Sequence, residues 1–178
     1  EPAYNYTGKI GGAFEFDGVD DIIKINHTDS INLSTDSNYS VSFWFKRFEA
    51  NLSANKYLLA KWETANQYPL KFSFEGGDGS NLVFATYQKV GAPQQISQAE
   101  TGEAYNDSLW HHVIGTSERQ NSTNSLLSIY VDGILKGMVN SSLNAISNSD
   151  PIILASFKGQ SNHLNGTMDD LMIFNRSL

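Results

Sequence analysis

In the stretch Val41-Ser42-Phe43-Trp44-Phe45-Lys46, the apolar residues Val41, Phe43 and Phe45 alternate with Ser42, Trp44 and Lys46 at a period of two. Successive side chains of a β-strand point to opposite faces of a sheet, so this period predicts a strand. Val41, Phe43 and Phe45 are expected in the core. Trp44 is expected on the opposite face. The same alternation recurs in residues 70–74, 82–85 and 127–131.

Turn residues divide the rest of the chain into about a dozen short strands. The pair Asp132-Gly133 predicts a tight hairpin between two of them. No stretch keeps the helical period for three turns, and residues 29–33 form at most one helical turn. Residues 88–108 are polar and predict a long loop or an irregular strand pair. The pattern predicts an all-β protein, a two-sheet antiparallel β-sandwich in which residues 1–178 form a single domain.

The composition narrows the class of protein. The chain has 178 residues, a net charge of −7 and no cysteine. This charge disfavours nucleic acids and anionic membranes as partners, and no apolar run approaches the ~20 residues of a membrane span. Asn-X-Ser/Thr occurs ten times, against about three expected by chance. The excess indicates a glycoprotein at the cell surface, although asparagine and serine also gather in the turns of β-proteins.

Two acidic segments, residues 13–25 and 164–178, lie near the two ends of the chain and resemble paired strands. Strand alternation from the neighbouring isoleucines predicts that Asp21 and Asp169 both point to the inner side. Two buried carboxylates need a cation or hydrogen-bond donors between them. A structural calcium ion is one candidate, with further oxygens from the turn Asp17–Asp20. The alternative is that these aspartates accept backbone N–H groups in turns.

Five motifs occur in one order along the chain and together resemble a known family. They are residues 14–21, 41–46, 110–113, 129–133 and 166–178. This set resembles the laminin-G-like, concanavalin A-like jelly roll, in its pentraxin-like branch. The resemblance implies a non-catalytic module for carbohydrate binding or adhesion, within a larger extracellular or cell-surface protein. The absence of cysteine favours a prokaryotic surface over an animal matrix. The resemblance also implies calcium, and its acidic positions fall on Asp17, Asp21 and Asp169.

The resemblance implies that family members vary most between Thr64 and Ser108 and that the ligand is selected there. Ligand-binding residues are therefore expected among the aromatic side chains in or beside this region. Trp62, Tyr68, Tyr87 and Tyr105 are the candidates, because sugars bind on aromatic rings beside polar groups. Glycans or surface proteins are the expected partners. A structural or protein-interaction spacer is the alternative function. A glycoside hydrolase is a more distant alternative. The stretch Glu15–Asp20 is the nearest to the Glu-X-Asp-X-X-Glu signature of such enzymes, but it ends in Asp rather than Glu, and Gly18 is expected to turn the chain before that third carboxylate.

Overall fold

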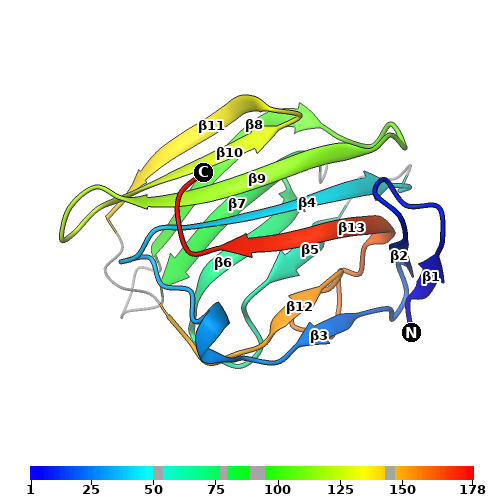
Figure 1. Cartoon of the computed structure of the whole chain (residues 1–178), viewed down its shortest axis with the longest axis horizontal. Coiled ribbons are helices and arrows are strands. Elements are labelled where there is room, and N and C mark those ends of the chain that lie inside the picture. The colour runs from blue at the N-terminus through cyan, green and yellow to red at the C-terminus, as the bar shows by residue number, and fades with distance from the viewer. Residues whose placement is uncertain (50–53, 77–79, 89–94, 143–146) are drawn as a thin grey trace.

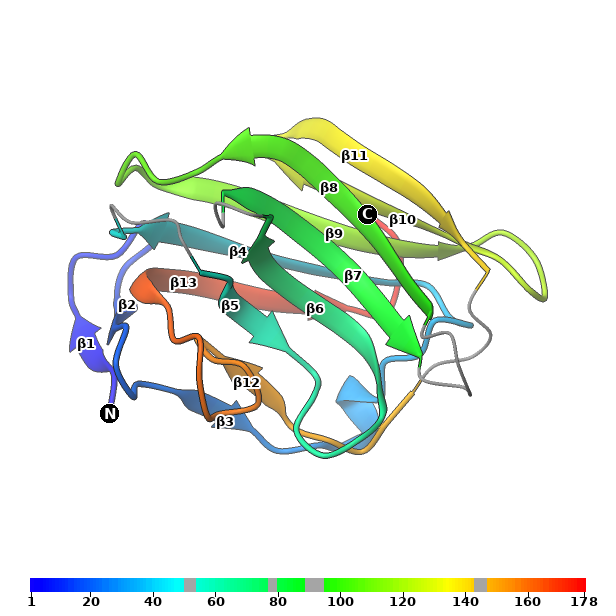
Figure 2. The same cartoon turned by 180° about the vertical axis from the view of Figure 1, so that it is seen from behind.

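The protein is a sandwich of two antiparallel β-sheets, seen from opposite sides in Figures 1 and 2. The computed structural model describes residues 1–49, 54–76, 80–88, 95–142 and 147–178. The seven-stranded sheet contains, in spatial order, β1 (Ala3–Asn5), β2 (Ala13–Asp17), β13 (Asn165–Phe174), β4 (Tyr39–Arg47), β9 (His111–Arg119), β10 (Ser125–Val131) and β11 (Ile134–Ser141). The six-stranded sheet contains β3 (Ile23–Ile25), β12 (Ile152–Leu154), β5 (Lys56–Ala60), β6 (Gln67–Glu75), β7 (Asn81–Gln88) and β8 (Gln95–Ala104). This architecture confirms the predicted β-sandwich.

Aromatic side chains fill the space between the sheets. Phe43 and Phe45 of β4 are fully buried, as their alternation predicted. Phe43 meets Phe72 of the facing sheet with ring centroids 5.1 Å apart, and Phe72 in turn stacks on Phe84 at 4.9 Å. Edge-to-face and offset pairs of this kind add to the free energy gained by burying the rings. The inner faces of the two sheets therefore form one continuous core.

The turn predictions are mostly confirmed. Asp132 and Gly133 both have positive φ and join β10 to β11, and the single helical turn is a 3-10 helix, Asp29–Ile31. The prediction for residues 88–108 is confirmed in part, in its second form. Gln88 ends β7, residues 95–104 form the edge strand β8, and the two strands make an irregular pair with a register shift between Asn81 and Val83. Ala99 of β8 enters the core. Residues 89–94 lie outside the described part. Within the described ranges, no helix has the length and apolar character needed to cross a membrane.

The two acidic segments are neighbours, as predicted. β13 pairs with β2 from Asn165 opposite Asp17 to Met168 opposite Phe14. A β-bulge then interrupts β13, at Asp170, which has a φ of 52°. The extra residue reverses the alternation, since it shifts every later side chain to the other face.

Candidate functional site

An aromatic surface lies on the outer face of the six-stranded sheet. It is formed by five half-buried or buried rings, each in contact with the next in space. In the order of these contacts they are Tyr57, Phe157, Trp62, Tyr68 and Tyr87. Trp62 lies 4.6 Å from Tyr68 between ring centroids, and Tyr68 stacks on Tyr87 at 5.2 Å with an interplanar angle of 20°. Three of the four predicted ligand-binding residues are thus brought together.

Strand register explains why these rings share one face. Tyr68 of β6 is directly opposite Tyr87 of β7. Tyr87 belongs to the same alternation as Val83 and Ala85, which lie outside the main core, whereas Leu82 and Phe84 lie within it. A register shift after Tyr68 turns its ring to the outer face, although the alternation of β6 otherwise points to the core. The stacked pair therefore stands on the outer side of the sandwich.

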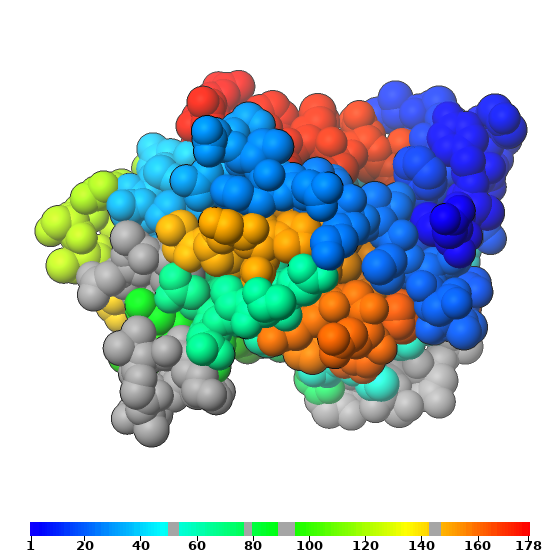
Figure 3. Space-filling view, turned by 90° about the horizontal axis from the view of Figure 1, so that it is seen from below, coloured from blue at the N-terminus to red at the C-terminus, as the bar shows by residue number. Residues whose placement is uncertain are grey.

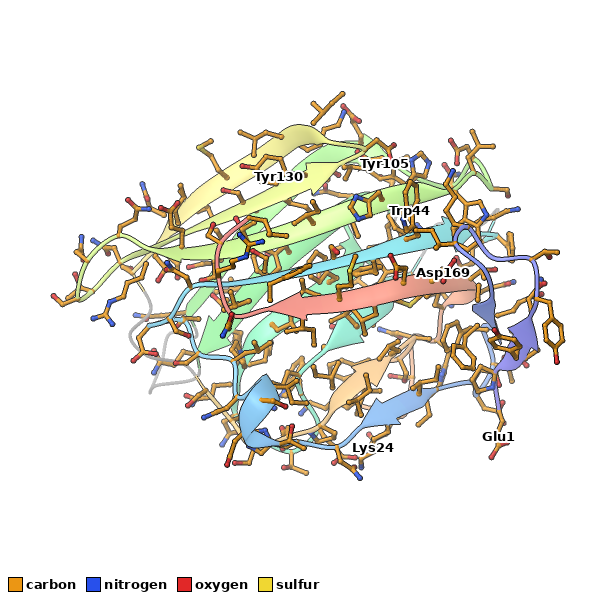
Figure 4. All side chains as sticks on the ribbon, viewed as in Figure 1. Glu1, Lys24, Trp44, Tyr105, Tyr130 and Asp169 are labelled. Atoms are coloured by element: carbon orange, nitrogen blue, oxygen red, sulfur yellow. The ribbon has the colours of Figure 1, made fainter. Side chains whose placement is uncertain are left out.

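Tyr105 does not belong to this surface. Its ring packs in the main core, 6.1 Å from Phe45 and 5.0 Å from His111 between centroids. Its hydroxyl donates a hydrogen bond to Glu103, and burial raises its pKa. In Figure 4, Tyr105 lies near one end of the seven-stranded sheet. The prediction placed it with the other three because it is near them in sequence, yet the chain returns to the core after β8.

The carboxylates that border the aromatic surface are already engaged. Glu75 accepts hydrogen bonds from Lys71 and from the Ser73 hydroxyl, and Glu63 pairs with Lys24 at 2.6 Å. The Lys71 ammonium lies 5.6 Å from the centroid of the Tyr68 ring. Burial raises the pKa of Tyr68, and the charge of Glu75 adds to this effect. Its hydroxyl therefore stays neutral and does not act as a base.

Asp150 fixes the segment that carries Trp62. One carboxylate oxygen accepts the backbone N–H groups of Glu63, Thr64 and Ala65 at 2.8–3.0 Å, and the other accepts the Thr64 hydroxyl. The Trp62 indole N–H donates in turn to the Ala65 carbonyl at 2.8 Å. Burial would raise the pKa of Asp150, but these donors outweigh it and hold that pKa below its ordinary value.

A second candidate site is the acidic turn between β2 and β3. Asp17, Asp20 and Asp21 each offer a carboxylate oxygen within 4.8 Å of the others. Asp21 is buried, as the alternation predicted, and it accepts the Asp17 N–H at 3.0 Å. The amino group of Glu1 lies 3.0 Å from its other oxygen. Three hard oxygens this close suit a calcium ion.

Asp169 lies elsewhere, and its predicted inward orientation was wrong. Asp169 is opposite Trp44, whose neighbours Phe43 and Phe45 point into the core. Both Trp44 and Asp169 therefore lie on the outer face of the seven-stranded sheet, as Figure 4 shows. The Asp169 carboxylate accepts the Ile10 N–H at 2.7 Å. The bulge in β13 explains the error, because the alternation was counted back through it from Ile173.

A sequence profile of the concanavalin A-like lectin/glucanases superfamily matches residues 17–178. The chain belongs to this superfamily. The matched range contains both sheets apart from β1 and all of β2 except Asp17. No curated protein sequence matches the chain closely.

Solved structures share the fold of this superfamily member at low sequence identity. The binding domain of paraclostridial mosquitocidal protein 1 has a TM-score of 0.75 at 20% identity, over 99% of this chain and 43% of that one. The binding domain of botulinum neurotoxin serotype G has a TM-score of 0.70 at 17% identity, over 100% of this chain and 42% of that one. Domain 4 of the extracellular arabinanase AbnA from Geobacillus stearothermophilus, in complex with arabinotriose, has a TM-score of 0.74 at 19% identity, over 100% of this chain and 77% of that one. The chain thus spans less than half the length of the two toxin domains.

The sequence prediction missed Tyr57 and Phe157 of the aromatic surface, and it missed Asp150 and Lys158, which contact the segment or ring of Trp62. Asp150, Phe157 and Lys158 come from the segments before and after β12, about 90 residues beyond Trp62. Figure 3 shows these yellow-orange and orange segments beside the green segment that follows β5. The pairing of β12 with β5 brings these segments together. No local sequence pattern marks this contact.

Proposed function

We propose that the chain is a non-catalytic carbohydrate-binding module of an extracellular or cell-surface protein. The observation that carries this proposal is the contiguous contact of Trp62, Tyr68 and Tyr87 on an outer sheet face. Flat aromatic surfaces bind the apolar faces of sugar rings, while polar groups at their margin orient the hydroxyls. The ten Asn-X-Ser/Thr motifs and the shared fold with a domain of an extracellular arabinanase support the location.

A binding role is also favoured over a catalytic one by the state of the nearby carboxylates. Glycoside hydrolysis needs one carboxyl group as an acid and a second as a base or nucleophile. Glu63 and Glu75 are each paired with a lysine, and Asp150 is occupied by backbone donors. Glu100 accepts the side-chain amides of Asn81 and Gln98. These carboxylates bind protein groups and leave the rings as the part of the surface suited to a ligand.

The test is a glycan array with the wild-type chain and the variants Trp62→Ala and Tyr87→Ala. We expect binding to a restricted set of glycans and a loss of about tenfold in affinity in each variant, because contact with one aromatic ring contributes about 0.5–1.5 kcal/mol beyond the area that it buries, and about 1.4 kcal/mol is a factor of ten. Tyr130→Ala is the matched control, since Tyr130 lies on the outer face of the opposite sheet (Figure 4). Thermal unfolding of each variant checks the fold. A uniform absence of binding across the array would favour the spacer function instead.

We further propose that Asp17, Asp20 and Asp21 hold a structural calcium ion. The proximity of their three carboxylates supports this, because their mutual repulsion falls when a cation lies between them. The ion would fix the turn between β2, in one sheet, and β3, in the other. Its effect would be on stability, at a site separate from the aromatic surface.

A further inference from the structure

The turn between β12 and β13 presents two side chains to the aromatic surface. Phe157 contacts Trp62 with ring centroids 5.0 Å apart, and the Lys158 ammonium lies 4.3 Å from the Trp62 ring centroid. The backbone reaches this arrangement through left-handed conformations at Ala155, Lys158 and Asn162, with φ of 65°, 54° and 54°. Residues other than glycine rarely adopt such a φ, because the Cβ atom is then crowded by the backbone.

Hydrogen bonds hold the turn in this conformation. The Phe157 N–H donates to the Ser161 carbonyl at 2.7 Å, and the Gln160 N–H donates to the Phe157 carbonyl at 3.0 Å. The Ser156 hydroxyl also donates to the Ser161 carbonyl. Backbone strain that is maintained by surrounding bonds is typical of functional sites. The conformation of this turn therefore fixes the backbone from which the Lys158 side chain reaches the Trp62 ring.

Lys158 differs from the other cations near this surface. Lys24 is paired with Glu63, and Lys71 is paired with Glu75. Lys61 donates to the Asp150 carbonyl. Lys158, by contrast, contacts only the faces of two aromatic rings among the described residues, with no carboxylate or carbonyl acceptor there. Its charge and its N–H donors are available to a ligand that packs on Trp62.

We propose that Lys158 determines ligand specificity by binding the carboxylate of an acidic sugar that packs on Trp62. This inference rests on the proposed carbohydrate-binding function and adds the class of sugar. A neutral sugar on the Trp62 ring would cover the ammonium and leave its charge without a counterion, whereas a uronate or another carboxylated sugar supplies that counterion. Charge-assisted hydrogen bonds of this kind are stronger than those to a hydroxyl.

The overall charge of −7 does not oppose this contact strongly. At physiological ionic strength, charges separated by more than about 8 Å are largely screened. The carboxylates nearest to the surface are also compensated by their own partners, as described above. Direct contact with Lys158 therefore governs the preference of this surface for a carboxylated sugar. The acidic remainder of the protein surface affects mainly the rate at which such a sugar associates.

The test compares carboxylated glycans with their methyl esters, which keep the sugar ring and remove the charge. An array of uronate-containing, sialylated and neutral oligosaccharides first identifies the carboxylated glycan that the wild-type chain binds most tightly. Titration with this glycan and its ester then gives the affinities of wild type, Lys158→Gln and Lys9→Gln. Lys9 is the matched control because its ammonium also lies over a tryptophan, 4.7 Å from the Trp44 ring centroid, on the other sheet.

We expect Lys158→Gln to bind the carboxylated glycan about tenfold more weakly and the ester unchanged, because a hydrogen bond to a charged group accounts for that factor. Lys9→Gln should match wild type for both. The inference would be overturned if the wild-type chain bound neutral glycans more tightly than carboxylated ones. If Trp62→Ala still weakened that binding, the proposed carbohydrate-binding function would stand. A loss of equal size for glycan and ester in Lys158→Gln would also overturn the inference. Failure of every glycan to bind would overturn the proposed function itself.

Discussion

Asp150 and Thr64 are joined by two hydrogen bonds, although 86 residues separate them in the sequence. The Thr64 N–H lies 3.0 Å from one carboxylate oxygen, and the Thr64 hydroxyl lies 2.9 Å from the other. Together with the N–H groups of Glu63 and Ala65, this places a buried anion at the centre of the turn that follows β5. The orientation of Trp62 depends on that turn through its bond to the Ala65 carbonyl.

The first prediction is that Asp150→Ala both destabilises the protein and weakens ligand binding. Removal of the carboxylate leaves three backbone N–H groups and one hydroxyl without their acceptor, and hydrogen bonds to a charged group contribute about 1.5–3 kcal/mol each at most. Because solvent can reach part of the released turn, we expect a loss of about 2–4 kcal/mol in the free energy of unfolding. Urea denaturation measures it.

Two further variants give the controls for this prediction. Asp150→Asn keeps one acceptor oxygen, so it should destabilise the protein less than Asp150→Ala. Asp36→Ala removes an exposed carboxylate that takes part in no described hydrogen bond, and it should leave the unfolding free energy unchanged within about 0.5 kcal/mol. Equal stability of Asp150→Ala and wild type would contradict the anchoring role of Asp150.

The second prediction concerns acid. The pKa of Asp150 is lowered in the folded protein from its ordinary value of 3.8, so its carboxylate stabilises the fold above that value. This contribution is lost as the pH falls below 3.8 and through the folded-state pKa. The stability difference between wild type and Asp150→Asn should therefore be largest near about pH 7 and should shrink towards about pH 3. Denaturation curves of both proteins across this range measure the difference. A constant difference would contradict the prediction.

The sequence predicted the architecture well because alternation is a local property. Phe43, Leu127 and Ile129 lie in the core as their period required, and the turn at Asp132 and Gly133 needed only local chemistry. Asp169 was misplaced because a single extra residue in β13 reverses the face of a side chain, and alternation alone does not reveal such a bulge.

The candidate site was predicted only in part, for a different reason. Trp62, Tyr68 and Tyr87 were identified by residue type and by their nearness in the chain. Lys158 and Asp150 reach the same surface through the pairing of β12 with β5, which brings together segments far apart in the sequence. Contacts of this kind depend on the order of strands in the sheet. The five short sequence motifs determine the fold class, but they do not determine which loops meet at the aromatic surface.

The third prediction tests the proposed calcium ion. Addition of calcium should raise the melting temperature of the wild-type chain, and a chelator should lower it again. A ligand that binds only the folded state stabilises it by about 2.7 kcal/mol at a concentration of one hundred times its Kd. Asp20→Asn and Asp21→Asn should abolish the response, because each removes a charge from the group formed with Asp17.

Asp169→Asn is the control for the calcium prediction. Its side chain lies on the outer face of the seven-stranded sheet, four residues along β13 from the residue opposite Asp17. There it accepts the Ile10 N–H, and the amide oxygen of asparagine can still accept that bond. Its calcium response should therefore equal that of wild type. A response lost in Asp169→Asn but kept in Asp20→Asn would contradict the proposed ligand set, and an unchanged melting temperature of wild type in chelator would contradict the ion.

The fourth prediction concerns Gly115 of β9, which faces the phenyl rings of the opposite sheet. A Cβ atom at this position would lie 2.4 Å from Cζ of Phe72 and 2.9 Å from Cδ2 of Phe84, which is closer than atoms in contact can come. Gly115→Ala should therefore force the stacked phenyl rings apart and lower the unfolding free energy by about 1–3 kcal/mol.

Phe72→Leu provides the background that tests this cause, because a smaller side chain frees the space that the new methyl group needs. On its own, Phe72→Leu should destabilise the protein through the lost ring contacts with Phe43 and Phe84. Combined with it, Gly115→Ala should cost less than in the wild-type background, so that the two effects are not additive. Urea denaturation of wild type, the two single variants and the double variant gives the four unfolding free energies of this double-mutant cycle. Additive effects would show that the cost of Gly115→Ala does not come from the close packing of Phe72.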